Sequence, residues 1–514
     1  MPTNQKLELT WIGKGKEESI EPRILIEDPK KGYGDRDKGN MLIHGDNLLA
    51  LKALEADYAG RVKCVYIDPP YNTGNAFDKY DDGLEHSIWL SLMKQRLEIV
   101  CNLISTDGVF FCNIDEQEHA YLKVMLDGIF GRNNFIGDII WKKRKGGGND
   151  SRFIALDHDY ILVYVKNSSK EVHKNKWRVS QSEDYLKRYS EIDEEGMRYY
   201  WDTLARDGLQ NPIPVTVNCP DGTSLSINSQ KSQATIAEGL SNGTIRLTQS
   251  RNGWTLHHRV YMPAGQVLRS IIEDVGTNKT AGDEMAALFG DSKAFPYPKP
   301  ESLIKRLLEL NTMPGDLVLD SFLGSGTTAA VAHKMNRKWI GIELGEHCYT
   351  HCLPRLKAVV DSEQGGISKA VNWQGGGGFK FYELAPSLLK KDKYGNWIIS
   401  EKYNAEMLTA AMAKHEGFKY CPDSEIYWKQ GYSTEKSYIF TTTAHVTAEY
   451  IDAIYNDLKS DESLLICAST FDPSVNHHKN INIKKIPKIL FDRCEFGKDN
   501  YNLNIISVPE VEEE

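Results

Sequence analysis

The sequence predicts an α/β fold in which parallel strands alternate with helices. Two stretches support this fold class. An apolar run at 62–67 ends in Asp68-Pro69-Pro70-Tyr71, and a strand, glycine turn, helix and strand follow one another over 317–343. Ligands of open parallel sheets bind at the carboxyl ends of the strands. We therefore expect the two stretches to meet at one ligand site, although they are far apart in the sequence.

The turn Asp68-Pro69-Pro70-Tyr71 is the most informative stretch of the chain. Two prolines cannot continue a sheet ladder, so the strand must end there and hold the turn rigidly. The Asp68 carboxylate and the Pro69 carbonyl can accept hydrogen bonds from an exocyclic amine, and the Tyr71 ring can stack on a flat base. The alternative is an ordinary loop in which Asp68 caps a neighbouring element and Tyr71 belongs to the core.

A glycine turn follows the second predicted strand. The strand at 317–320 leads into Phe322-Leu323-Gly324-Ser325-Gly326, and a helical pattern follows. The glycines let the backbone pass close to a ligand, and the helix N-terminus faces that ligand. Glu343 ends the next strand, where an acidic residue suits a ribose with two free hydroxyls. Because only Gly324 and Gly326 of a dinucleotide fingerprint are present, the turn is informative mainly through its strand–helix–strand setting.

Together the two motifs resemble the amino-methyltransferases of DNA, which use S-adenosyl-L-methionine. The catalytic motif precedes the glycine motif, which is the order of the β class. The resemblance implies a Rossmann-like methyltransferase fold with a circularly permuted motif order. It also implies that Asp46 contacts the cofactor adenine and that Lys299 lines the methionine end of the pocket. The predicted residues are Asp68, Pro69, Pro70 and Tyr71 for catalysis, and Asp46, Asn47, Lys299, Asp320, Phe322, Gly324, Gly326, Thr327 and Glu343 for cofactor binding.

A narrower resemblance links residues 1–385 to the modification (Mod) subunits of type III restriction-modification systems. It rests on the stretches 7–11, 72–90 and 276–279. It implies a homodimer that binds double-stranded DNA and a restriction (helicase-nuclease) subunit as a partner. Ser321 departs from the family pattern, which more often has proline after the aspartate. The chain is also shorter than many such subunits, which leaves the nuclease partner open.

The motif order divides the chain into four expected segments. Residues 1–166 and 286–378 form the two parts of the catalytic domain. Residues 167–285, which are rich in Asn, Ser, Thr, Gly and Trp, fall where the resemblance places an inserted target-recognition domain. Four glycines at 375–378 indicate a flexible joint. Beyond it, residues 379–514 contain a strand–helix–strand pattern typical of a small α/β accessory or dimerisation domain, and end in an acidic tail.

The formal net charge of -9 does not exclude DNA binding, which needs only a local basic surface. Residues 142–178 hold ten lysines or arginines and four acids, a balance of +6. Phosphate contacts there would fix the register of DNA without reading its sequence, and the alternative is a solvated surface loop. Within 167–285, arginine suits guanine, and asparagine or glutamine suits adenine. The predicted DNA contacts are Lys142, Lys143, Arg144, Lys145 and Arg251, with Arg246, Gln249 and Asn252 as further candidates.

Composition favours a cytoplasmic enzyme. No apolar segment is long enough to span a membrane, and the first residues lack an apolar signal region. Nine cysteines without a C-x-x-C pair indicate reduced thiols. The helical spacing of His347, Cys348, His351 and Cys352 could suit zinc, but ligands from one helix alone do not close a tetrahedral site. We therefore expect structural roles for these four side chains and no metal.

The resemblance predicts methyl transfer to the N6 amine of an adenine that is flipped out of the duplex. Asp68 and the Pro69 carbonyl would each accept a hydrogen bond from the amine. These bonds favour its pyramidal, more nucleophilic form in the transition state. Cytosine N4 is chemically close to adenine N6 and could use the same four residues. Two further alternatives stay open: a DNA-reading scaffold for a helicase-nuclease partner, and an RNA substrate.

Overall fold

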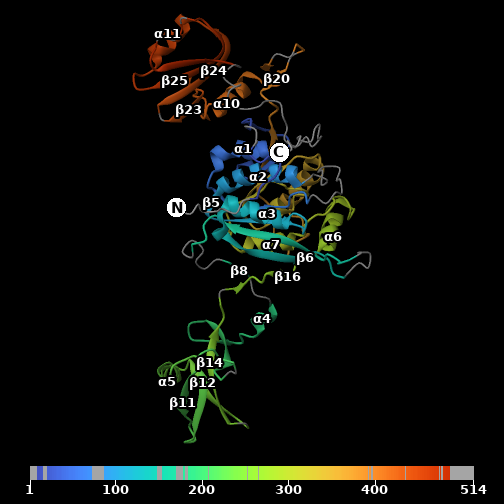
Figure 1. Cartoon of the computed structure of the whole chain (residues 1–514), viewed down its shortest axis with the longest axis vertical. Helices are drawn as coiled ribbons and strands as arrows, with labels where there is room; N and C mark the ends of the chain where they lie inside the picture. The colour runs from blue at the N-terminus through green and yellow to red at the C-terminus, as the bar shows by residue number, and fades with distance from the viewer. Residues whose placement is uncertain are drawn as a thin grey trace, which may run out of the picture. The chain divides into compact units, whose positions relative to one another are not determined.

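The computed structural model divides into two compact units, Met1–Lys176 with Arg269–Glu514, and Trp177–Leu268 (Figure 1). The acidic tail, Asn252 and part of the stretches that carry the Mod resemblance lie outside the residues that the structure describes. The described residues are 9–15, 20–71, 86–146, 153–169, 177–179, 183–205, 208–251, 253–263, 265–391, 393–394, 397–434, 436–473, 475 and 478–486.

An eleven-stranded sheet organises the first unit, in the order β1-β19-β3-β18-β17-β4-β5-β7-β6-β16, with β2 paired to β19. From β19 to β5 all neighbours run parallel, and β7 is antiparallel to both β5 and β6. The predicted parallel α/β sheet is therefore confirmed. Its strands are β1 (Leu25–Glu27), β2 (Tyr33–Gly34), β3 (Met41–His44), β4 (Val62–Ile67), β5 (Ile104–Ile114), β6 (Phe135–Lys142), β7 (His158–Val165), β16 (Ile271–Ile272), β17 (Leu317–Asp320), β18 (Lys338–Glu343) and β19 (Gly378–Leu384).

Strands β4 and β17 bring the two motifs together. All six residues of β4 are buried, as expected for a parallel strand covered on both faces. Val318 and Leu319 of β17 pair in parallel with Cys64 and Val65 of β4. Parallel neighbours end at the same edge of a sheet, so the two sequence motifs share that edge.

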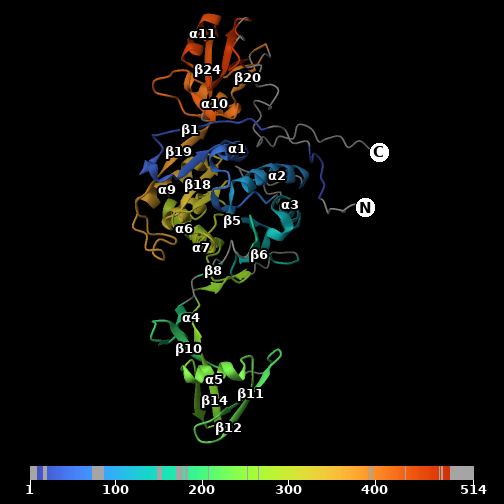
Figure 2. The same cartoon turned by 90° about the vertical axis from the view of Figure 1, so that its left-hand side faces the viewer.

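Two groups of helices cover the sheet. In one group, α2 (His86–Leu103) contacts both α1 (Asn47–Tyr58) and α3 (His119–Leu126). In the other, α8 (Thr327–Lys334) contacts both α7 (Glu301–Glu309) and α9 (Leu353–Val360). Figure 2 shows strands β5 and β18 between α1 to α3 on one side and α7 and α9 on the other. Among the described helices, none combines the length and the apolar character needed to cross a membrane.

The second unit is built on the four-stranded sheet β13-β14-β10-β9 and the hairpin β11-β12. Its core contains Val215, Val217, Ile236, Ile245 and Leu256. Strands β8 and β15 pair with each other where the chain enters and leaves the unit. The elements are β8 (Arg178–Val179), α4 (Glu183–Lys187), β9 (Glu191–Ile192), β10 (Arg198–Thr203), β11 (Ile213–Asn218), β12 (Ser224–Ser229), α5 (Gln233–Ser241), β13 (Ile245–Ser250), β14 (Gly253–Tyr261) and β15 (Gln266–Val267).

The structure shifts the segment boundaries that the sequence suggested. The second unit starts at Trp177 and ends at Leu268, so it is shorter than the expected 167–285. The chain after it rejoins the first unit, because β16 pairs with β6 and α6 (Asn278–Phe289) follows.

The expected boundary at 378/379 is wrong, because β19 pairs with β3 inside the central sheet. The glycine run before it is also held in place. Gly376 N donates to the Val360 carbonyl over 2.8 Å, and the Gly377 carbonyl accepts from Asp35 N over 3.0 Å. These glycines form packed backbone and not the expected joint.

The chain beyond β19 contributes a smaller sheet, β22-β23-β24-β25-β26, and the strand pair β20-β21. Strands β24, β25 and β26 run parallel, and α11 connects the first two, which confirms the predicted strand–helix–strand pattern. The elements are β20 (Leu389–Lys391), β21 (Trp397–Ile399), α10 (Ala405–His415), β22 (Lys419–Tyr420), β23 (Gly431–Thr434), β24 (Ser437–Val446), α11 (Ala448–Asp457), β25 (Ser463–Phe471) and β26 (Ile481–Lys485).

Candidate active site

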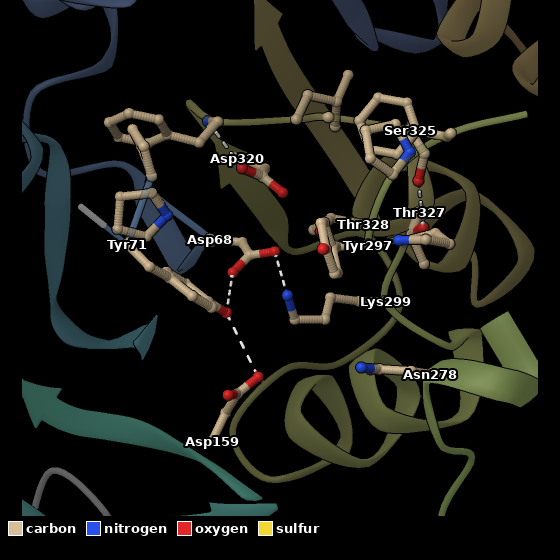
Figure 3. Close-up of a pocket in the computed structure, with 18 of the residues that line it drawn as sticks. Asp68, Tyr71, Asp159, Asn278, Tyr297, Lys299, Asp320, Ser325, Thr327 and Thr328 are labelled. Carbon is tan, nitrogen blue, oxygen red and sulfur yellow. Dashed lines mark hydrogen bonds and ion pairs between the residues drawn. The ribbon is translucent and has the colours of Figure 1, made fainter. Parts of the chain in front are cut away.

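A cavity of about 620 Å³ opens at the carboxyl ends of β4 and β17 (Figure 3). Its size is typical of a small-molecule site. Both sequence motifs contribute to its lining, together with the segment 294–299. The predicted catalytic and cofactor residues that line it are Asp68, Pro69, Pro70, Tyr71, Lys299, Asp320, Phe322, Gly324 and Thr327.

The Asp68 carboxylate receives donors on both oxygens. Tyr71 Oη donates to Asp68 Oδ1 over 2.7 Å, and Lys299 Nζ donates to Asp68 Oδ2 over 2.5 Å (Figure 3). The turn itself is fixed from behind, because Trp89 Nε1 donates to the Pro70 carbonyl over 2.7 Å. Asp68 is thus held as a hydrogen-bond acceptor that faces the cavity.

A second carboxylate, Asp159 of β7, lies beside the first. Asp159 Oδ1 accepts from Lys143 Nζ over 2.6 Å, and its Oδ2 lies 3.5 Å from the Tyr71 hydroxyl. Asn113 of β5 donates to both Asp68 and Asp159, over 3.3 and 3.4 Å. Sequence reasoning missed Asp159 and Asn113. Their position on β5 and β7, the two strands that follow β4 in the sheet, was the only signal available, and it required the strand order to be known.

Tyr71 remains a neutral donor in this network. Burial raises the pKa of the Tyr71 phenol well above its usual value, and the charges of Asp159 and Asp68 raise it further. The Lys299 ammonium lies 5.3 Å from the centre of the Tyr71 ring. In the structure the ring is therefore anchored by its hydroxyl, and its predicted stacking on a base stays a prediction.

The glycine turn has the backbone conformation that its sequence suggested. Gly324 and Gly326 have φ angles of 57° and 84°, which favour glycine, and α8 starts directly after them. Glu343 does not line the cavity as the ribose prediction implied. It lies behind the turn, where its Oε2 accepts from Gly324 N over 2.7 Å and its Oε1 from Gly345 N over 3.0 Å.

Asp320 is almost fully buried at the end of β17. Its Oδ1 accepts from Phe322 N over 2.9 Å. Burial raises the pKa of Asp320 to about 7, although bonds from Thr328 and Phe322 act in the opposite direction. Its protonation therefore changes close to neutral pH.

Asp46 and Asn47 are also placed differently from the prediction, because neither belongs to the described lining of the cavity. Asp46 Oδ1 caps α1 by accepting from Leu48 N and Leu49 N over 2.8 and 3.2 Å. Asn47 Nδ2 donates to the Ser321 carbonyl over 2.7 Å. In the structure both residues support the strand ends and do not face the cavity.

The predicted DNA-contacting residues fall in different environments. Lys143 and Arg144 line the cavity, and Lys143 is paired with Asp159 instead of facing outward. Lys142 is half-buried at the end of β6, and Lys145 is exposed. Arg251 is exposed in the turn between β13 and β14 of the second unit.

The histidine and cysteine cluster has separate partners. His347 Nε2 lies 2.8 Å from Glu343 Oε1, His351 Nε2 lies 2.8 Å from the Ala294 carbonyl, and Cys352 Sγ donates to the Gly324 carbonyl. Within the described part of the chain, no group of three or more His, Cys, Asp or Glu side chains is arranged to hold a metal ion. The cluster packs against the glycine turn.

Tyr66 is a further cavity residue that sequence reasoning missed. It precedes Asp68 on the same face of β4 and is 2% exposed. Its hydroxyl lines the cavity and has no hydrogen-bond partner among the described residues. A buried hydroxyl of this kind is costly unless a ligand or water satisfies it.

Comparisons with known proteins agree with this geometry. A protein named "Probable type III restriction-modification enzyme HindVI Mod subunit", from Haemophilus influenzae, is 34% identical over 68% of this chain and 54% of its own length. The StyLTI Mod subunit of Salmonella typhimurium is 28% identical over 64% of this chain and 56% of its own length. The EcoP15I Mod subunit of Escherichia coli is 26% identical over 76% of this chain and 73% of its own length. The chain thus spans about half the length of the first two relatives. The sequence profile of the N6/N4 methyltransferase family, described as DNA methylase, matches residues 62–352, which is more than half of the chain, and the protein belongs to this family.

Proposed function

We propose that the protein transfers a methyl group from S-adenosyl-L-methionine to the N6 amine of adenine in double-stranded DNA at a specific site. One observation carries this proposal. The Asp68 carboxylate and the glycine turn at Gly324 line the same cavity, from neighbouring parallel strands. An acceptor for an amine and a backbone turn suited to a nucleoside are thus within one site.

The residues present fit S-adenosylmethionine. When bound, this cofactor supplies an electrophilic methyl group next to a positively charged sulfur. Lys299 offers an ammonium for the cofactor carboxylate. Asp320 and the Tyr66 hydroxyl offer acceptors for its ammonium group, and the Tyr66 hydroxyl has no other partner among the described residues. Gly324 adds no side chain where the backbone borders the cavity.

Asp68 is the proposed acceptor for the amine of the target base. Its Oδ1 already accepts from Tyr71 and Asn113, and its Oδ2 accepts from Lys299. The cofactor carboxylate competes with Asp68 for Lys299, which makes Oδ2 the oxygen that becomes accessible when Lys299 turns to the cofactor. Asp68 then stabilises the positive charge that develops on the amine as the new bond forms.

Lys143, Asp159 and Asn113 have a positioning role in this proposal. They hold the side of the cavity formed by β5, β6 and β7. Lys143 holds Asp159 in place, and Asp159 and Asn113 together orient the Tyr71 hydroxyl. The target base must be flipped out of the duplex to reach this side of the cavity.

We also propose that the protein acts as the Mod subunit of a type III restriction-modification system. The names of the relatives support this assignment. A homodimer and a helicase-nuclease partner belong to the same proposal. The proposed DNA contacts are Arg144 at the cavity and Lys142, Lys145 and Arg251 elsewhere. The proposed supports of the cofactor site are Asp46, Asn47, Gly326 and Glu343.

The test is methyl transfer from labelled S-adenosylmethionine to unmethylated genomic DNA by the purified protein, with the modified base identified in digested DNA and mapped. N6-methyladenine at one short sequence is the expected result. N4-methylcytosine would change the substrate but keep the chemistry. Preference for structured RNA over duplex DNA would overturn the substrate class. Cofactor binding without transfer, combined with activation of a nuclease partner, would show a scaffold instead of an enzyme.

A further inference from the structure

The sheet β13-β14-β10-β9 of the second unit has two chemically different faces. Residues opposite each other on antiparallel strands point to the same face, and successive residues alternate. Leu247 pairs with Leu256, and these side chains belong to the hydrophobic core of the unit. The next pair, Arg246 with His257, must therefore lie on the other face.

The second face carries arginines next to aromatic rings. Register places Trp201 opposite Arg259 and Tyr199 opposite Tyr261, on the same face as Arg246 and His257. The core residues of the unit include none of these side chains. We call this set of six residues the arginine–aromatic face.

The two arginines are stacked on the rings. The Arg246 guanidinium lies 4.1 Å from the centre of the Trp201 ring, and the Arg259 guanidinium lies 4.7 Å from the centre of the Tyr199 ring. Trp201 is itself fixed, because its Nε1 donates to Glu191 Oε2 over 3.1 Å. Stacking restrains the long arginine side chains without using their N–H groups. The donors of Arg246 thus remain available at an exposed position.

We propose that the arginine–aromatic face binds duplex DNA, with Arg246 and Arg259 as the charged contacts. This inference rests on the proposed function. A restrained guanidinium matches both phosphate oxygens and the O6 and N7 edge of guanine. Two acids border the face: Glu191, which accepts from Trp201, and Asp193, which accepts from Tyr261 and lies near Arg259. The proposed contact therefore rests on the guanidinium N–H groups, above all those of the exposed Arg246, and not on an excess of positive charge.

The structure separates the candidates that the sequence could not rank. Gln249 alternates to the face of Leu247, and Arg251 lies in the turn beyond the strand. Only Arg246 of the described candidates lies on the arginine–aromatic face. Arg259 joins it from the neighbouring strand and had no local sequence signal.

The test compares Arg246→Gln, Arg259→Gln and the double variant with Arg198→Gln. Arg198 is an exposed arginine of β10 that alternates to the opposite face from Tyr199, so it controls for the loss of one charge in the same unit. We would measure affinity for duplex DNA at two salt concentrations by fluorescence anisotropy, using the site mapped for the wild-type protein. Cofactor binding and the thermal unfolding midpoint would be measured in parallel.

Each single variant should bind duplex DNA about 5- to 100-fold more weakly, the range for losing one arginine contact. Equal weakening on all sequences with a smaller salt dependence would identify phosphate contacts, and loss of preference at one position would identify a base contact. Arg246→Lys, which keeps the charge without the planar fork, should fall between Gln and wild type if the contact is bidentate. DNA affinities of both glutamine variants equal to that of Arg198→Gln would overturn the inference.

The proposed function can fail independently of this inference. If the wild-type protein does not methylate DNA, the proposed function fails, whatever the arginine variants do. If the wild type methylates DNA and the double variant does so with unchanged affinity and site preference, only the arginine–aromatic face is excluded. If a glutamine variant loses cofactor binding or unfolds at a lower temperature, Trp201→Phe and Arg246→Lys take its place. Trp201→Phe keeps an aromatic ring under Arg246 but cannot donate to Glu191. Weaker DNA binding by Arg246→Lys with normal DNA binding by Trp201→Phe would support the contact between Arg246 and DNA, and wild-type DNA affinity in both variants would exclude it.

Discussion

The first unit contains two clusters of charged side chains that look alike by residue type but differ in their surroundings. In the cavity, Asp68 is bonded to Lys299 and Tyr71, and the pair faces open space. Behind the glycine turn, Glu301 of α7 is bonded to Lys334 of α8 and to Arg355 of α9, over 2.8 and 2.9 Å, and all three side chains are at most 2% exposed.

The difference shows which ion pairs a ligand can replace. Glu301 also accepts from Ile367 N over 3.0 Å, so both of its oxygens are satisfied by fixed groups. Burial would raise the pKa of Glu301, but Arg355 and Lys334 outweigh it and hold the pKa below its ordinary value. This cluster ties three helices together. Asp68 also has three donors, Tyr71, Asn113 and Lys299, but it faces space that a ligand can enter, so a ligand can take over its bonds.

The largest expected effect is on catalysis by Asp68→Ala. Methyl transfer should fall about 1,000-fold, the upper range for removing one preorganised electrostatic contact. Cofactor affinity should stay unchanged or rise, because Lys299 no longer has Asp68 as a competing partner. Single-turnover methylation and calorimetric cofactor titration check the two parts. Full methylation by a folded variant would rule out the assignment of Asp68.

The matching change in the buried cluster is Lys334→Met. It leaves Glu301 with one fewer cation in a sealed site, so the free energy of unfolding should fall by about 3 kcal/mol. The rate of methyl transfer per folded molecule should stay close to wild type. Urea unfolding checks the first part. Lys305→Met is the control, because it removes only a surface pair with Glu309 on α7 and should cost less than about 0.5 kcal/mol. Equal losses for both variants would contradict the comparison.

Two lysines of the cavity should affect different substrates, Lys299 the cofactor and Lys143 the DNA. Lys299→Met should raise KM for S-adenosylmethionine about 10-fold, which corresponds to the loss of one charge-assisted hydrogen bond. Lys143→Met should leave that KM nearly unchanged and raise KM for DNA, because Lys143 lies on the wall formed by β6 and β7. Steady-state kinetics with each substrate varied in turn will show this crossover. If both variants changed the two KM values in the same way, Lys299 and Lys143 could not be assigned to different substrates.

The smallest effect concerns Asp320 and pH. The pKa of Asp320 rises from an ordinary 3.8 to about 7 on folding, mainly through burial. Between these values the folded protein holds a proton that the unfolded chain has lost, so the free energy of unfolding falls as pH rises through this window. Asp320→Asn cannot titrate at this position. The free energy of unfolding of the variant, relative to that of the wild type, should therefore increase between pH 5 and pH 8. A constant difference between the two proteins across this range, measured by urea unfolding, would show that Asp320 does not titrate there.

Short sequence motifs predicted those parts of the site that a single turn of the chain forms. The prolines of the Asp68 turn and the glycines at 324 and 326 mark strand ends whatever the rest of the chain does. The side chains that surround Asp68 could not be predicted in this way. Asp159 reaches the cavity, and Asn113 reaches Asp68 beside it, only because β5 and β7 follow β4 in the sheet. This order depends on tertiary packing.

One prediction was wrong and another stays a prediction, because a residue type has more than one physical use. Four consecutive glycines indicate flexibility in isolation, yet an added Cβ at Gly378 would lie 2.3 Å from Asp35 N, so glycine is needed there for close backbone contact. Asp46 and Glu343 stand at strand ends, as cofactor ligands do, but their carboxylates are used by backbone N–H groups. Sequence patterns alone cannot tell a carboxylate that binds a ligand from one that supports the loop beside it.

The antiparallel pair of β8 and β15 has a consequence for how such a protein can change over time. The chain passes into and out of the second unit through two adjacent two-residue strands, Arg178–Val179 and Gln266–Val267. Insertions are tolerated when their ends lie close together. The 177–268 unit can therefore be exchanged for another of different length and sequence, by recombination at two short junctions, while the strand order and the cavity of the first unit are retained.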